Sequence, residues 1–103
     1  MKNVIVLLSL VLSASSFACQ TYQAQILAKV SKVETDSLTY CKAYVDSTRV
    51  EMYSEHGICP LSLESVMTNG VDLPLENGHD CEVRVGDTLT GYLVDDGNRI
   101  ILE

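Results

Sequence analysis

The feature that most constrains this chain is an apolar leader followed by four cysteines. Residues 1–18 carry one lysine, an apolar run over Val4–Leu12 and small residues up to Ala18, which is the pattern of a cleaved secretory signal peptide. Export brings a chain into an oxidising compartment, where paired cysteines form disulfides. We therefore expect a periplasmic or secreted protein with two disulfides, made by Cys19, Cys41, Cys59 and Cys81.

The leader admits two other interpretations. Its apolar run is shorter than the roughly 20 residues that a membrane-spanning helix needs, so no stable membrane insertion is expected. Cys19 directly after the leader could carry a lipid, but bacterial lipoprotein signals favour leucine three residues earlier, where Ser16 stands. Lipidation would also leave an odd number of cysteines, so simple cleavage before Cys19 is favoured.

The remaining chain is short and acidic. Removing 18 of the 103 residues leaves 85, which predicts one small domain over 19–103 with a thin core that depends on disulfides. This part carries three lysines and three arginines against fourteen acids, a formal charge of −8. Such a surface repels phosphate backbones and excludes nucleic acid as a favoured partner. An exported basic protein, a cationic peptide or a neutral glycan is expected instead.

Most of the mature sequence alternates between apolar and polar residues, as β-strands do. The longest such run is 22–30, and the parity of its apolar positions changes at 31–32, which predicts a bulge that bends the strand. Further strands are expected over 38–45 and 49–55. These first three strands are predicted to form a meander.

The second half of the chain predicts one helix and a hairpin. Residues 60–67 place apolar side chains at helical spacing, and Asn69–Gly70 is a typical helix end. Shorter extended pieces are expected at 71–75 and 81–85, and the strands 88–94 and 99–102 are joined by a turn. Three strands, a helix and two closing strands predict a mainly β, disulfide-stabilised, OB-fold-like five-stranded barrel; a plain antiparallel barrel or sandwich is the alternative.

Four cysteines allow three pairings, and the sequence does not choose among them. A bond between Cys59 and Cys81 would tie the helical segment to the barrel, so this pair is favoured. The remaining pair, Cys19 with Cys41, requires the amino-terminal segment to fold back over the barrel.

Two histidines lie close to two of the cysteines and raise the possibility of a metal site. His56 stands three residues before Cys59, and His79 stands two residues before Cys81, with Asp80 between them. No Cys-x-x-Cys or His-x-x-x-His spacing is present, and cystine sulfur does not bind zinc as a thiolate does. Polar surface histidines are the favoured interpretation, with no metal and no cofactor.

Catalytic motifs are missing from the sequence. It has no Gly-x-Ser-x-Gly elbow, no His-Glu-x-x-His and no phosphate-binding glycine loop, and its acids are scattered over predicted turns. The run 95–98 has some features of a calcium loop but lacks the later glutamate, so it is predicted to be a turn. We expect no enzymatic activity.

The tyrosines suggest a binding surface instead. If Cys41, Ala43 and Val45 point into the core, period-2 geometry places the residues between them on the outer face. The same alternation applies to the next strand. Exposed tyrosines supply stiff contact area with a polar tip, and OB-folds bind ligands on this side. The predicted partner-binding residues are Tyr40, Lys42, Tyr44, Glu51 and Tyr53. Tyrosines that only cover the core are the competing interpretation.

A cysteine at the first mature position followed by the extended segment Ala24–Val30 is similar to netrin-like domains, which include the tissue inhibitors of metalloproteinases. The resemblance implies that the amine and carbonyl of Cys19 chelate the zinc of a protease. It covers about the first third of the chain, and Thr21 stands where those inhibitors have a second cysteine.

Taken together, the sequence features predict a module that binds an exported protein or glycan. The alternatives are an inhibitor or capping subunit of another exported protein and a histidine-based metal-binding protein.

Overall fold

The computed structural model of the protein describes residues 19–35, 40–76 and 80–103. The predicted signal peptide and residues 36–39 and 77–79 lie outside these ranges. The described elements are, in chain order, β1 (Tyr22–Lys29), β2 (Lys32–Thr35), β3 (Tyr40–Tyr44), the 3-10 turn η1 (Ser47–Arg49), β4 (Val50–Glu55), α2 (Leu63–Asn69), β5 (Val71–Glu76), β6 (Asp80–Cys81), β7 (Thr88–Asp95) and β8 (Ile100–Leu102).

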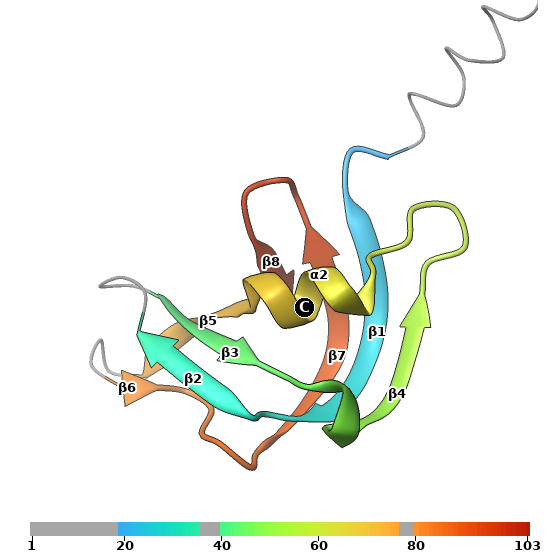
Figure 1. Ribbon diagram of the computed structural model, residues 1–103. Coiled ribbons are helices and arrows are strands. Elements are labelled where there is room, and N and C mark those ends of the chain that lie inside the picture. The colour runs from blue at the N-terminus through green and yellow to red at the C-terminus, as the bar shows by residue number, and fades with distance from the viewer. Residues whose placement is uncertain (1–18, 36–39, 77–79) are drawn as a thin grey trace, which may run out of the picture.

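The strands form one curled sheet. Its order is β2-β3-β5-β8-β7-β1-β4, and β6 pairs with β5. All pairs are antiparallel except β5 with β8, which is parallel. The sheet curls into a half-barrel, and α2 lies over the hollow between its two arms (Figure 1). The predicted mainly β fold with one short helix is therefore confirmed.

The predicted long first strand is divided where the sequence changes parity. The amide of Val30 donates to the carbonyl of Asp87, and the carbonyl of Val30 accepts from Gly86. The next amide, that of Ser31, donates instead to the carbonyl of Tyr44 on the other arm. The chain therefore changes its pairing partner within one residue, and this change connects the two arms of the sheet.

The core lies on the concave side of the sheet. The predicted inward positions Cys41, Ala43 and Val45 are buried, as are alternate residues of β1. Val66 of α2 is buried in the same cluster and fills the hollow. Burying these side chains supplies the hydrophobic part of the stability. The buried cluster consists of Ala24, Ile26, Ala28, Val30, Cys41, Ala43, Val45, Leu61, Val66, Val71, Leu73, Leu89, Leu93 and Ile100.

The predicted helix and its end are confirmed. The hydroxyl of Ser62 accepts from the amide of Ser65 and caps the first turn of α2. Gly70 ends the helix with a φ of 75°, and a Cβ at this position would lie 2.9 Å from the ring of Tyr44. Glycine is required here for both reasons. Within the described ranges, no helix has the length and apolar character needed to cross a membrane.

The predicted meander is confirmed for its first two strands, because β2 pairs with β3, but the predicted pairing of the second strand with the third is wrong. The strand 50–55 pairs with β1, and β3 pairs with β2 and β5. The described residues form eight strands, and α2 follows the fourth of them, so a five-stranded barrel is not confirmed. The extended piece expected at 81–85 is limited to β6, because the chain turns at Gly86, where the amide of Asp87 donates to the carbonyl of Arg84. The predicted hairpin of β7 and β8 is confirmed.

The disulfides join Cys19 to Cys59 and Cys41 to Cys81, so the favoured pairing is wrong. The position of β4 explains the first bond: after β4 the chain continues beside β1, where the amide of Gln23 donates to the carbonyl of Cys59. The second bond follows from β5. Cys41 is opposite Leu73 of β5 and Cys81 is opposite Leu75, which brings the two cysteines to neighbouring positions on either side of the same strand.

Both disulfides close loops of the same sequence separation, 40 residues. Each should stabilise the fold by about 4 kcal/mol in the chain-entropy account. Cys41 is fully buried, so its replacement also leaves a core cavity. We expect Cys41→Ala with Cys81→Ala to lower the free energy of unfolding more than Cys19→Ala with Cys59→Ala, measured by denaturant unfolding. Equal losses would contradict the core position of Cys41. A Cys59–Cys81 peptide in mass mapping would contradict the observed cysteine pairing.

Candidate functional site

The five predicted partner-binding residues do not lie on one surface. Tyr40, Lys42 and Tyr44 are on β3, whereas Glu51 and Tyr53 are on β4. In the sheet, β5, β8, β7 and β1 separate β3 from β4. The sequence placed them together because two successive strands were expected to pair. The correction is that the predicted face is divided into two separate parts.

Tyr53 is a packing residue. It is opposite Ile26 of β1, on the core side of the sheet, and its hydroxyl donates to the carbonyl of Leu61 at 2.5 Å. Burial raises the pKa of this hydroxyl, and the nearby Glu55 carboxylate adds to the rise. Glu51 has no opposite residue, because the register shifts by one between Leu27 and Ala28. It is the extra residue of a β-bulge on an exposed strand.

Two substitutions of Tyr53 test this role. Tyr53→Phe leaves the Leu61 carbonyl without its donor and should reduce the free energy of unfolding by about 1 kcal/mol. Tyr53→Ser also removes the ring from the core side and should cost about 2–4 kcal/mol. Urea unfolding followed by circular dichroism measures both. A binding role without packing would instead leave the stability of Tyr53→Ser unchanged.

The outer side of β3 carries a buried ion pair. Lys42 and Asp72 are directly opposite each other on β3 and β5, with Nζ 2.7 Å from Oδ1. Their side chains are 21% and 9% exposed, and Asp72 is the one buried polar residue found in the described ranges. A buried carboxylate is tolerated only with a close partner. This pair fixes the position of the Lys42 ammonium on the outer face.

Both β3 tyrosines lie beside cations. The guanidinium of Arg99 lies over the ring of Tyr40, 4.2 Å from its centroid, and Nζ of Lys32 is 5.1 Å from the ring centroid of Tyr44. Tyr44 also donates to Glu34 at 3.4 Å. Hydrogen bonding and attraction between Lys32 and Glu34 raise the pKa of the lysine and lower that of the glutamate. We call Tyr40, Lys42, Tyr44, Asp72 and Arg99 the β3 face.

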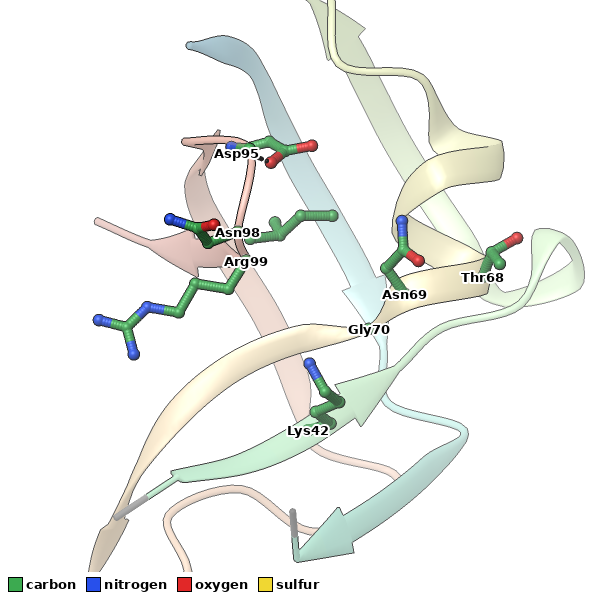
Figure 2. A pocket seen from close by; sticks show the side chains of 9 residues that line it. Lys42, Thr68, Asn69, Gly70, Asp95, Asn98 and Arg99 are labelled. Carbon is green, nitrogen blue, oxygen red and sulfur yellow. Dashed lines mark hydrogen bonds between the residues drawn. The ribbon is translucent and has the colours of Figure 1, made fainter. Parts of the chain in front are cut away.

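A cleft of about 350 Å³ opens beside this face. It lies between the carboxyl end of α2, the amino end of β5 and the β7–β8 turn (Figure 2). Lys42 rises from β3 toward Gly70, and Arg99 extends away from the helix. The cleft is lined by Lys42, Thr68, Asn69, Gly70, Asp95, Gly97, Asn98, Arg99 and Ile100.

The β7–β8 turn is held in shape by its own carboxylates. Asp95 accepts from the amide of Gly97, and Asp96 accepts from the amides of Asn98 and Arg99. These amides, with Asn98 first, hold the pKa of Asp96 below its usual value. These hydrogen bonds define the backbone of the turn, which forms one wall of the cleft.

Of the residues that line this cleft, the sequence predicted a binding role for Lys42 alone. The segment 95–98 was correctly assigned to a turn, but its position beside α2 depends on the parallel pairing of β5 with β8. Asp72 offered one signal: it is a lone carboxylate inside the apolar segment Val71–Leu75. A charge in such a place needs a partner, and Lys42 is that partner.

The metal hypothesis is tested only in part. His79 lies outside the described residues, and His56 accepts hydrogen bonds from the amides of Ile58 and Cys59 through Nδ1, which orders the turn after β4. Among residues 19–35, 40–76 and 80–103, no group of three or more metal-binding side chains comes together. A site that includes His79 stays a prediction.

No protein-family model, curated protein or solved structure matches this chain.

The ion pair provides a test of how the β3 face is built. Asp72→Asn leaves Lys42 without a counter-charge in a mostly buried position and should reduce the free energy of unfolding by about 1–3 kcal/mol. Glu34→Gln is the matched control, because it breaks an exposed pair with Lys32 and should leave stability unchanged. Equal effects of the two substitutions in thermal unfolding would show that Asp72 has no special role.

Proposed function

We propose that this protein is an exported binding module that recognises a protein or glycan partner through the β3 face. The single observation that carries the proposal is the Lys42–Asp72 pair, which positions a cation on an outer sheet surface beside a cleft. Groups that are fixed before binding lose little conformational freedom when the partner arrives. Tyr40, held beside Arg99, adds stiff contact area at the same place.

The compartment is part of the proposal. Two disulfides in so small a fold are consistent with an oxidising environment, as is the leader-like sequence of residues 1–18. The partner should therefore occur in the periplasm or outside the cell. The surplus of acids argues against nucleic acid as that partner.

An OB-like architecture also belongs to the proposal. If β1 and β2 are counted as one strand bent at Val30–Ser31, the path through β3, β5, β8 and β7 back to β1 is a ring of five strands. In this interpretation β4 and β6 are additions to the ring. OB-folds bind ligands on the outer side of their second and third strands, to which β3 and β5 would correspond.

A second candidate is an inhibitor or capping subunit whose acidic surface meets a basic exported partner. The observation that favours it is the formal charge of −8 on residues 19–103, together with exposed acids on β4 such as Glu51 and Glu55. Charge-led association is screened by salt. Binding through the β3 face, where the cations are already paired, should depend little on ionic strength.

The test is capture of partners from the exported fraction of the source organism by the immobilised protein. Tyr40→Ser should reduce capture of the specific partner by about tenfold and leave the melting temperature close to the original. Met52→Ser, which changes an exposed residue on β4, is the control and should capture normally. Repeating the capture at about 50 and 500 mM NaCl separates the two candidates.

Two results would overturn the proposal. If Tyr40→Ser lowers the melting temperature as strongly as Tyr53→Ser, Tyr40 only covers the sheet. If Tyr40→Ser is stable and still captures the partner, and high salt abolishes that capture, the capping subunit explains the function better than the β3 face does.

A further inference from the structure

We propose that the cleft between α2 and the β7–β8 turn is a binding site for a neutral carbohydrate. The proposal rests on the proposed function, because it names the class of partner and the place where it is held. The cleft has a volume of about 350 Å³, which is at the small end of the range for ligand pockets, about 300–1,000 Å³. A site of this size fits a short polar segment such as one end of an oligosaccharide.

Charge balance argues for a neutral ligand. The cations of the cleft, Lys42 and Arg99, are matched in number by two carboxylates, Asp72 under Lys42 and Asp95 in the turn. An anion would find Lys42 already paired and would also meet the carboxyl end of α2, where helix carbonyls carry partial negative charge. A cation would find the carboxylate of Asp72 already paired with Lys42 and that of Asp95 already accepting from the amide of Gly97. A ligand without charge avoids both penalties.

The polar groups of the cleft suit vicinal hydroxyls. The side-chain amides of Asn69 and Asn98 each offer hydrogen-bond donors and an acceptor. The carboxylate of Asp95 accepts, and the hydroxyl of Thr68 both donates and accepts. A sugar hydroxyl is likewise both donor and acceptor, so it can complete hydrogen bonds with any of them. Asn69 at the end of α2 and Asn98 in the β7–β8 turn belong to different walls of the cleft, so each wall carries a side-chain amide (Figure 2).

Rigid elements hold these groups. Asn69 is the last residue of α2, directly before Gly70, whose close contact with the Tyr44 ring fixes the end of the helix against β3. The backbone N–H of Asn98 donates to the carboxylate of Asp96, which fixes the position of this residue in the turn. A site whose walls are set before binding can discriminate between isomeric sugars.

The same features make a peptide the weaker candidate. Peptides are recognised by free strand edges or by pockets for apolar side chains. The lining of the cleft includes one large apolar residue, Ile100, which is itself buried, and the β5 and β8 edges that border it are already paired with each other. A peptide would therefore gain little beyond single hydrogen bonds.

The test is a titration of the isotope-labelled, disulfide-bonded protein with neutral hexasaccharides of glucose, N-acetylglucosamine, xylose and mannose, followed by amide NMR shifts. The expected result is that at least one sugar shifts the amides of Asn69, Gly70 and Asn98, with an affinity that changes little between about 50 and 500 mM NaCl. Asn98→Ala should weaken binding about tenfold. Gln25→Ala, which changes an exposed amide on β1, is the matched control and should bind normally.

The outcomes separate this inference from the proposed function. If no sugar shifts the cleft amides, or if Asn98→Ala and Gln25→Ala bind equally well, the carbohydrate site is wrong. If the carbohydrate site is wrong but Tyr40→Ser reduces capture of a protein partner, the β3 face is still supported as the functional surface. If a sugar shifts the cleft amides and Tyr40→Ser captures normally, the cleft is confirmed and the β3 face is not.

Discussion

The pairing of β4 with β1 is the constraint on which the rest of the structure depends. Because β4 lies along β1, the chain leaves it beside the amino terminus, and the Cys19–Cys59 bond fixes that arrangement. The position next to β3 is then open for β5, which brings Asp72 opposite Lys42. The parallel pairing of β5 with β8 follows, and with it the cleft between α2 and the β7–β8 turn. One strand pairing thus determines both disulfides and the candidate site.

Local structure could be predicted well from the sequence because local physics decides it. The capped helix over Leu63–Asn69, the hairpin of β7 and β8 and the division of the first strand near Ser31 each depend on a few neighbouring residues. Periodicity also placed Cys41, Ala43 and Val45 in the core. These are the features that alternation, caps and turn residues encode.

Long-range pairing could not be predicted in the same way. The alternation of residues in β4 predicts an outer and an inner side but does not identify its partner strand. Pairing with the preceding strand was predicted because consecutive strands are usually neighbours. That error moved Tyr53 to the wrong surface and led to the wrong cysteine pairing. Arg99 and Asn98 were missed for the same reason: nothing near them in the sequence indicates that the end of α2 lies opposite.

The bulge at Glu51 has a consequence for the behaviour of the molecule in concentrated solution. β4 is the last strand of the described sheet, and its outer edge offers backbone groups that another copy could pair with. The extra residue interrupts the regular ladder, and Glu51 and Glu55 bring like charges together when two such edges approach. The terminal strand therefore lacks the long, regular and uncharged edge that favours pairing between copies.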